Sequence, residues 1–384
     1  MPAKTVTHWW TPMTVAVALA ALAAIVLVAA IMAADRLDGA AAAPGEPSSA
    51  EVSRDTPDAS AEVSADPTPG VSDDAATDDR PEAPEGGTTS ATDDRGTLTI
   101  HHVGDVNLDP SQQSPASVAD PANPWNGARD TFADADLVLV NLECAATDGG
   151  AALDKQFVFR CDLDALPAMR DAGVDVVTLA NNHTGDFGVP GIVDSLRNVE
   201  AAGMLGVGVG ADEAEAYRPR IVEVQGWRVA IVGFGGVVPT PDWIARDGAP
   251  GQASGYDPVR MARAVEMAAA DADLVIATVH WGEEGAFTPR PEDRDKADAM
   301  IAAGADVVFG HHAHRLQPLE RVDGVPVFWN LGNFVWPSLS EDASRTAVAE
   351  FTIDPDGRTR ACLRPFRIDG GGVPRPTGDA PDCE

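Results

Sequence analysis

Short apolar runs alternate with amphipathic segments along the chain from Thr97 onward. The run "DLVLVNLE" at 136–143 is typical of a buried strand that ends in polar residues. The segment at 220–235 has the form of a hairpin that turns at Gln225-Gly226. The other strands that this pattern predicts lie at 97–103, 174–180, 206–210, 273–284, 305–314, 319–334, 346–354 and 361–368.

Helical spacing separates several of these strands. The segment 164–173 has the pattern of a helix that is stopped by Gly173, and further helices are expected at 190–202, 257–271 and 290–303. Strands that alternate with helices predict one α/β domain. We place this domain at 97–369 and a Gly-, Pro- and Asp-rich C-terminal tail at 370–384.

A long apolar segment precedes the domain. Met13–Ala34 carries no charge, and at about 1.5 Å per residue it spans the ~30 Å hydrocarbon core of a membrane. A cleaved signal peptide is the alternative, because "AAAPG" at 41–45 offers a cleavage site. We predict an uncleaved transmembrane anchor at 13–34 after a short cytoplasmic tail at 1–12. The protein would then be a single-pass protein of the cell membrane whose domain is extracellular.

The charge of the chain is strongly negative and unevenly placed. The formal net charge of −33 makes nucleic acid an unsuitable partner, because a phosphate backbone attracts the opposite sign. Residues 35–96 are acidic, rich in Pro, Ser, Thr and Ala, and poor in aromatic or branched apolar residues. Such a segment cannot bury enough surface to offset the entropy of ordering, so we predict a disordered linker at 35–96.

Four cysteines suit an exported chain. Cys144 and Cys161 lie in one local region, and Cys362 and Cys383 both lie near the C-terminus. Among the three possible connectivities we therefore expect bridges 144–161 and 362–383. Four unpaired thiols are the alternative, and a metal-binding thiolate at Cys144, next to Glu143, is a further one.

Polar residues of ligand type follow five of the predicted strands. They are Asp105 in "GDVNL", Glu143 in "NLE", Asn182 and His183 in "ANNH", His280 in "VHWG", and His311, His312 and His314 in "GHHAH". Ligands of open α/β sheets gather beyond the carboxyl ends of the strands, so these side chains are expected to meet at one rim. Carboxylate, carbonyl and imidazole groups together suit one or two divalent ions of Mn, Zn, Fe or Mg.

Taken singly, most of these motifs have a structural explanation. Gly-Asp after a strand is often a turn, Asn-Asn-His often caps a helix, and "HWG" suits core packing. The motif "GHHAH" differs, because three adjacent imidazoles add nothing to packing or capping. The whole series in this order favours a metal site, where a pair of ions bridged by one carboxylate would activate water and hold a phosphoryl group.

The series also resembles a known family. The motifs "GDVNL", "NLE", "KQFVFR", "LANNHTGDFG", "HWGEE", "GHHAH" and "NLGNF" resemble, in order, those of the capsule synthesis protein CapA family, also called poly-γ-glutamate synthesis proteins. The resemblance covers residues 98–336. It implies a fold similar to that of calcineurin-like metallophosphatases, a β-sandwich flanked by helices in four αββα layers.

The resemblance also implies roles for individual residues. His312 and His314 match the two closing metal ligands, and Asn182 matches a metal-binding asparagine. His183 is then a candidate proton donor. Asp105 and His280 match the remaining ligands.

Two positions depart from the metallophosphatase pattern. Asn107 stands where the opening Asp-x-His motif has histidine, and Glu143 of "NLE" replaces the usual bridging aspartate. The extra imidazole of His311 is a candidate to orient a ligand or handle protons.

Five further residues near the motifs have candidate roles. Glu284 is a candidate base or substrate contact, with a solvated loop acid as the alternative. Lys155 and Arg160 are candidate anion contacts for a substrate, or else ordinary surface charges. Asn330 and Asn333 in "NLGNF" are expected to fix a turn.

Two classes of function remain open from the sequence. The first is a metal-dependent hydrolase or transferase that acts on a cell-surface polymer or other cell-surface substrate, at either a phosphoester or a γ-glutamyl amide. The second is an assembly or export factor for such a polymer, which retains the metal site and works with membrane partners. Resemblance to the family points to capsule or poly-γ-glutamate biosynthesis in either case.

Overall fold

The computed structural model describes residues 95–337 and 339–384. These residues form a mixed α/β fold with several sheets and helices, as expected from the sequence. The predicted tail at 1–12, the predicted membrane span at 13–34 and nearly all of the predicted linker at 35–96 lie outside the described residues. Within the described part of the chain, none of the helices has the length and apolar character needed to cross a membrane.

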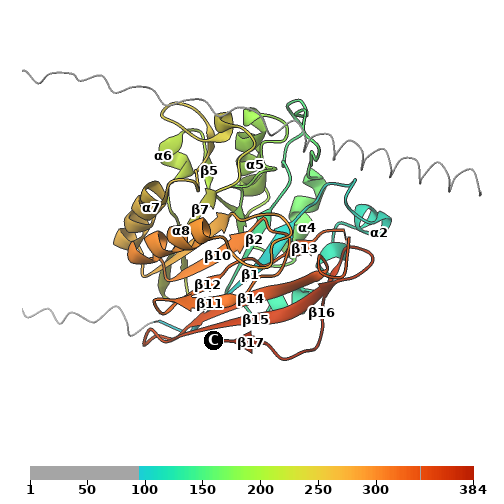
Figure 1. Cartoon of the computed structure of the whole chain (residues 1–384). Helices are drawn as coiled ribbons and strands as arrows, with labels where there is room; N and C mark the ends of the chain where they lie inside the picture. The colour runs from blue at the N-terminus through green and yellow to red at the C-terminus, as the bar shows by residue number, and fades with distance from the viewer. Residues whose placement is uncertain (1–94, 338) are drawn as a thin grey trace, which may run out of the picture. The chain divides into compact units, whose positions relative to one another are not determined.

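The larger sheet has nine strands (Figure 1). Its parallel part is built from consecutive segments of the first half of the domain, namely β1 (Leu98–Val106), β2 (Leu137–Leu142), β3 (Val176–Thr178) and β4 (Leu205–Val207). Strand β13 (Asn333–Val335) also pairs with β1 in parallel. On the other edge the chain returns as antiparallel strands β14 (Arg345–Ile353), β15 (Thr359–Ile368), β16 (Pro374–Pro376) and β17 (Asp382–Cys383).

The smaller sheet has six strands, and all of them come from residues 220–328. Its order is β11 (Leu319–Val322), β12 (Val325–Phe328), β10 (Val307–His311), β9 (Leu274–His280), β7 (Trp227–Gly235) and β6 (Arg220–Val224). Strands β6 and β7 form the predicted hairpin, with Gln225 and Gly226 at positive φ in its turn. The three central strands β7, β9 and β10 run parallel to one another.

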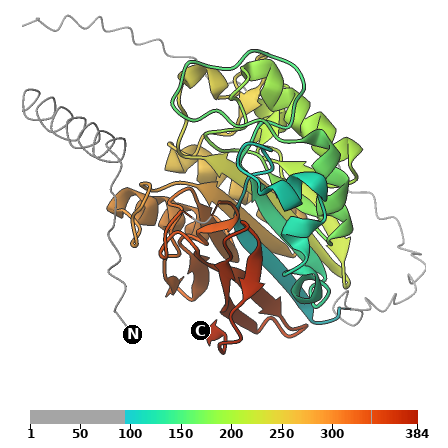
Figure 2. The same cartoon turned by 90° about the vertical axis from the view of Figure 1, so that its right-hand side faces the viewer.

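The two sheets pack face to face and helices cover their outer faces. One core cluster joins apolar side chains of both sheets, such as Ile100 and Leu139 of one and Ile276 and Phe309 of the other. Helices α3 (Arg129–Phe132), α4 (Leu166–Asp171) and α5 (Val189–Ala201) pack on the larger sheet, and α7 (Pro258–Asp271) and α8 (Pro291–Ala302) pack on the smaller one. These two groups of helices lie on opposite sides of the sheets (Figure 2).

The connections between these layers contain short additional elements. They are α2 (Pro115–Ala119), η1 (Asn123–Trp125), η2 (Leu163–Ala165), β5 (Val209–Gly210), α6 (Glu213–Ala216), η3 (Pro241–Trp243) and β8 (Gly251–Gln252). Strands β5 and β8 pair with each other as a separate two-stranded sheet.

Two disulfides join the pairs of cysteines expected from the sequence. Cys144 bonds to Cys161 and Cys362 bonds to Cys383, so the predicted connectivity is confirmed. The second bridge fastens β17 to β15, where the two cysteines are cross-strand partners. Residues 370–384, expected only as a tail, thus add two short strands to the edge of the larger sheet.

Candidate metal centre

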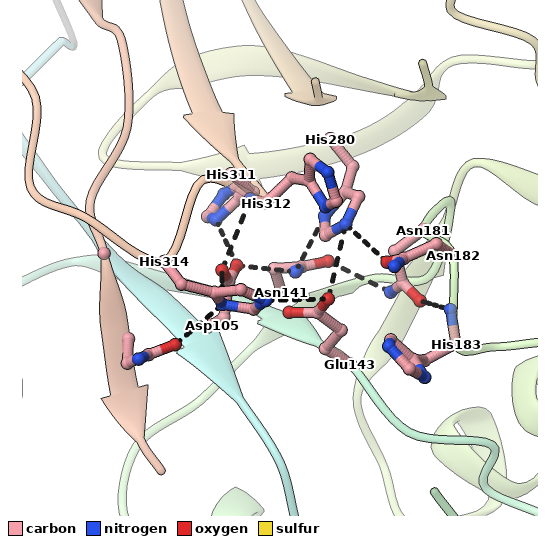
Figure 3. Close-up of polar contacts among 12 residues, drawn as sticks. Asp105, Asn141, Glu143, Asn181, Asn182, His183, His280, His311, His312 and His314 are labelled. Carbon is pink, nitrogen blue, oxygen red and sulfur yellow. Dashed lines mark hydrogen bonds and ion pairs between the residues drawn. The ribbon is translucent and has the colours of Figure 1, made fainter. Parts of the chain in front are cut away.

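Polar side chains from five strands meet where the parallel strands of both sheets end (Figure 3). They are Asp105 in β1, Glu143 directly after β2, Asn182 in the loop after β3, His280 at the end of β9, and His311, His312 and His314 at and beyond the end of β10. The two sheets therefore contribute to one site. The structure brings together all of the residues that the sequence marked as metal ligands.

Glu143 is the central acid of this cluster. Its side chain is fully buried, and neither carboxylate oxygen makes a hydrogen bond. Its Oε1 lies 3.4 Å from Nε2 of His280 and 3.9 Å from Nε2 of His314. A buried ionised carboxylate without hydrogen bonds is costly in free energy, so this side chain either takes up a proton or binds a cation.

Asp105 has the opposite environment, because histidines surround it. Its Oδ1 lies 3.1 Å from Nδ1 of His311, and its Oδ2 lies 3.2 Å from Nδ1 of His314. The amide nitrogen of Asn141 donates to Oδ1 at 2.9 Å, and the backbone N–H of His312 donates to Oδ2 at 3.3 Å. These contacts hold the carboxylate in one orientation.

The backbone at the end of β10 has an unusual conformation that aims the imidazoles. His312 and His314 both have positive φ, 90° and 52°, which is uncommon for residues other than glycine. Gly310 precedes them, and a Cβ at that position would collide with the carbonyl oxygen of Trp329. Backbone strain of this kind persists where the surrounding structure imposes it, and it is concentrated at functional sites.

The ligand atoms are spaced as coordination of a cation requires. Two atoms that each bind one ion at ~2.1 Å lie about 3.0–3.4 Å apart at octahedral to tetrahedral angles. The Nε2 of His280 lies 3.4 Å from Oε1 of Glu143, which is within this range. Its distance of 2.8 Å from Oδ1 of Asn182 is that of a hydrogen bond, so an ion bound by all three side chains would replace this contact and separate the two atoms slightly.

Three overlapping groups of side chains could share such ions within the described residues. In each group the ligand atoms lie within 4.8 Å of one another, and the groups are Glu143–His280–His312, Asp105–Glu143–His314 and Glu284–His312–His314. Glu143 belongs to two of them, which suits a carboxylate that bridges two ions. Glu284, expected as a base or a substrate contact, thus lies within reach of a metal position.

The protonation states of the cluster also suit metal binding. Burial alone would raise the pKa of Asp105, but hydrogen bonds from His311 and His314 hold it well below its usual value. Burial, reinforced by the neighbouring charge of Asp105, raises the pKa of Glu143 well above its usual value. Burial and the nearby His314 lower the pKa of His312 to about 3, so its ring nitrogens are neutral. In the absence of an ion the neutral form of Glu143 is therefore favoured, and a bound cation would favour its ionised form.

His183 lies beside the cluster and is held by an acid that the sequence did not mark. Its Nδ1 lies 2.8 Å from Oδ2 of Asp186, and Lys155 forms an ion pair with the other oxygen of Asp186. Burial lowers the pKa of His183 despite the contact with Asp186, so the ring is neutral near pH 7. With Nδ1 bound to Asp186, Nε2 is the ring nitrogen that remains for a substrate.

Several other predicted residues have local roles. Lys155 donates to the carbonyl of Asn182 at 2.7 Å and so supports the loop that carries His183, rather than pointing to a free anion site. Arg160 donates to the carbonyl of Gly149 at 3.0 Å and stacks on the ring of Phe187. Both basic side chains thus make contacts within the protein, and these contacts give them a structural role.

The two asparagines of "NLGNF" divide between a turn and the site. Asn330 accepts from the backbone N–H of Gly332 at 3.0 Å, which is the expected turn. Asn333 differs from the expectation, because its Oδ1 lies 2.8 Å from Nδ1 of His314. Asn107, at the position that departs from the metallophosphatase pattern, accepts from the backbone N–H of Asp109 at 2.9 Å.

Sequence reasoning missed the amides that connect the ligands. Asn141 of β2 donates to Asp105 and lies 3.3 Å from Nδ1 of His280, while its Oδ1 accepts from Asn181 at 3.1 Å. Asn181 in turn accepts from the backbone N–H of His183 at 3.0 Å. The signal for Asn141 was a polar residue inside the otherwise apolar run "DLVLVNLE", a position where asparagine is depleted in strands.

A cavity of about 490 Å³ opens next to the cluster. His183, His314 and Glu284 line it on the side of the ligands. Phe157, Phe159 and Trp336 are among the aromatic and polar residues that line the rest, whereas Arg160 does not line it. A substrate in this cavity would contact both His183 and the candidate metal ligands His314 and Glu284.

The fold and the site define a class: a two-sheet α/β protein with a candidate divalent-metal centre at the strand ends and a substrate-sized cavity beside it. Over residues 99–338 the chain matches the family described as bacterial capsule synthesis protein PGA_cap. This chain belongs to that family, and the resemblance to CapA proteins noted in the sequence is thereby confirmed.

Individual relatives carry related names. The chain is 31% identical over 232 residues to the capsule biosynthesis protein CapA of Bacillus anthracis, covering 60% of this chain and 56% of that protein. It is 36% identical over 211 residues to a probable polyglutamine synthesis accessory protein of Mycobacterium tuberculosis, covering 52% of this chain and 55% of that protein. The chain thus spans a little over half the length of these relatives.

A solved structure also aligns with the chain. It is a hypothetical protein from Thermus thermophilus, with a TM-score of 0.43 and 19% identity, covering 75% of this chain and 99% of that one.

Proposed function

We propose that this protein is a divalent-metal-dependent hydrolase or transferase with a metallophosphatase-like fold. Its substrate would be a cell-surface polymer or phosphoester, in the biosynthesis of capsule or poly-γ-glutamate. The names of its relatives support the pathway, and the layered arrangement of two sheets and outer helices supports the fold.

The observation that carries the proposal is the environment of the Glu143 carboxylate. This carboxylate is fully buried, has no hydrogen bond, and faces imidazoles of His280 and His314. In the metal-free protein a proton neutralises such a group, and a bound divalent ion would compensate its ionised form instead. When bound, divalent ions lower the pKa of water and neutralise the charge of a reacting group.

Different residues would bind the ions and orient the ligands. Asp105, Glu143, Asn182, His280, His312 and His314 would hold the ions, with Glu284 in reach of one position. His311 and Asn141 fix the orientation of Asp105. These contacts keep the ligands in place before a substrate arrives, which lowers the cost of reorganisation during the reaction.

His183 would transfer the proton. Asp186 holds Nδ1 and the ring is neutral at pH 7, so Nε2 would accept the proton that the attacking water loses. The resulting imidazolium would be stabilised by Asp186 and would give this proton to the leaving group. This order refines the role of proton donor expected from the sequence.

The test compares His183→Ala with His312→Ala in the purified domain. His183→Ala should keep the metal content and reduce turnover of phosphoester or γ-glutamyl substrates by roughly 10²–10⁴-fold, which is the usual contribution of a positioned acid or base. His312→Ala should lose both metal and turnover. Undiminished turnover in both variants would refute the catalytic function.

The same variants separate catalysis from a role in polymer assembly. An assembly factor that only binds metal should retain surface polymer in cells carrying His183→Ala and lose it with His312→Ala. The proposal also includes membrane tethering and membrane partners, which rest on the apolar segment Met13–Ala34 alone. N-terminal sequencing of membrane-extracted protein tests this part, since a mature start near Pro44 would exclude an anchor.

A further inference from the structure

The cavity beside the metal centre has a row of aromatic side chains on one wall. Phe159 packs on the ring of His183 with centroids 4.4 Å apart, and Trp336 packs on the ring of His314 at 4.8 Å. Phe159 and Trp336 meet edge to face at 5.8 Å. Phe157 extends the row outward at 6.3 Å from Phe159, and 57% of its surface is exposed to solvent.

This row offers uncharged surface that leads from solvent to the candidate catalytic groups. A contiguous row of aromatic side chains that lines a cavity is typical of a ligand-binding surface, because an apolar ligand body can cover it. The row therefore suits a substrate whose body is uncharged near the reacting bond.

One basic side chain, Arg315, lines the same cavity. It directly follows His314, and its guanidinium donates one hydrogen bond, at 2.7 Å, to the carbonyl oxygen of His314. Among the described residues it forms no ion pair, although most arginines of this acidic domain pair with a carboxylate. Four of its five N–H donors are therefore free for a ligand.

Glu284 is the acid that lines the cavity together with Arg315. Its carboxylate is within ligand reach of His312 and His314, so an ion bound there would neutralise it. The charge of Arg315 would then remain uncompensated in the cavity. A guanidinium in this setting binds a carboxylate or phosphate oxygen pair with two parallel hydrogen bonds.

We propose that Arg315 is a specificity-determining residue that binds an anionic group of the substrate, a carboxylate or a phosphate. The uncharged body of the same substrate lies on Phe157, Phe159 and Trp336. The inference deepens the proposed function and rests on it for the position of the reacting bond, between His183 and His314. It assigns the substrate class as an anion carried on an uncharged body.

The experiment measures binding rather than turnover, with full-length protein loaded with Mn²⁺ and again after removal of metal. The probes are hippurate, which has one carboxylate on an aromatic amide, phenyl phosphate, and the uncharged methyl ester of hippurate. Calorimetry should give a Kd for an anionic probe that is at least about tenfold higher in Arg315→Ala than in wild type, because a charge-assisted pair is lost. Arg315→Lys should fall between the two, and the methyl ester should bind all forms equally.

Arg129→Ala is the matched control. Arg129 is also partly exposed, also donates from Nη1 to a backbone carbonyl, that of Asp171, at 2.8 Å, and does not line the cavity. Arg129→Ala removes the same charge from the protein as Arg315→Ala, so an effect of overall electrostatics would appear equally in both variants.

Each outcome decides the proposal. A loss confined to hippurate identifies a carboxylate as the bound group, and a loss confined to phenyl phosphate identifies a phosphate. Equal effects of Arg315→Ala and Arg129→Ala, or a wild type that prefers neither anion to the ester, overturn it. If binding depends on Arg315 but turnover is absent with every substrate, the hydrolytic function fails and the anion site stands.

Discussion

Asn182 and His280 meet across the two sheets, with the amide Oδ1 of Asn182 2.8 Å from the imidazole Nε2 of His280. Asn182 follows β3 of the larger sheet and His280 ends β9 of the smaller one, 98 positions later in the sequence. An ion that binds both side chains would therefore connect the two halves of the sandwich.

We expect metal to stabilise the domain through this connection. A ligand that binds only the folded state raises stability by RT ln(1 + [L]/Kd), about 2.7 kcal/mol at 100 times Kd. Mn²⁺ or Zn²⁺ should therefore raise the Tm of wild type, as measured by calorimetry, and His280→Ala should abolish the increase. His101→Ala is the control, because His101 is equally buried but contacts Glu350 of β14 instead of the site. An unchanged response in His280→Ala would argue against the assigned ligand.

Glu143→Gln should have opposite effects with and without metal. The raised pKa of Glu143 means that its ionisation in the folded state is unfavourable, so stability falls as pH rises above the unfolded pKa of about 4.3. Without metal, the neutral Gln should therefore increase the Tm at pH 7. With metal, the variant should lose the stabilisation seen in wild type. Thermal unfolding with and without EDTA measures both, and a lower Tm of the metal-free variant would contradict this account.

The two disulfides should differ in their effect on the site. Each closes a loop of similar length, with sequence separations of 17 and 21, so removal of either bridge should cost roughly 3 kcal/mol in the chain-entropy model. Cys144 directly follows Glu143, whereas Cys362 and Cys383 join β15 and β17 at the sheet edge. The double variant Cys144→Ala/Cys161→Ala should weaken metal binding, and Cys362→Ala/Cys383→Ala should leave it unchanged. Titration with Zn²⁺ and a competing chelator checks this; equal affinities would show that the first bridge is only structural.

Glu350 should stabilise the fold in a pH-dependent way far from the metal centre. A hydrogen bond with His101, together with the charge and the 2.6 Å hydrogen bond of Arg364, lowers the pKa of Glu350 to about 2. Arg360 donates a further hydrogen bond to the same carboxylate at 3.0 Å. Because the folded pKa is below the unfolded one, this stability is present above about pH 4.3 and is lost as pH falls toward 2. Glu350→Gln should cost about 1–3 kcal/mol at pH 7, a range that allows for screening of the partly exposed arginines, and the difference should shrink below pH 4. Urea unfolding at several pH values measures it; a difference independent of pH would exclude the charge as its cause.

The sequence predicted the regular elements of the domain well. The run at 136–143 contains β2, because a strand that is buried on both faces is apolar along its length. The helical pattern at 257–271 contains α7, because only one face of this helix is buried. The helix expected at 164–173 is divided into η2 and α4, with Pro167 in the first turn of α4. Elements without a periodic pattern, such as α2 and β8, were not predicted, since their formation depends on tertiary contacts.

The ligands of the site could be predicted for a simple geometric reason. A polar residue at the carboxyl end of a parallel strand is placed by the strand itself, so Asp105 and His280 needed no knowledge of loops. The partners that act through loops could not be found in this way. Asp186 reaches His183 through the turn at 183–186, and Arg315 enters the cavity through the conformation of the loop after β10.

The contact between Asp105 and His311 joins residues that are 206 positions apart. No short fragment of the chain contains both halves of the centre, so the ligands assemble only after β10 has paired with β9. The complete site can therefore bind an ion only after the two sheets have come together. Which ion occupies it would then depend on the cations present where the chain completes its folding, rather than on those present where the chain is synthesised.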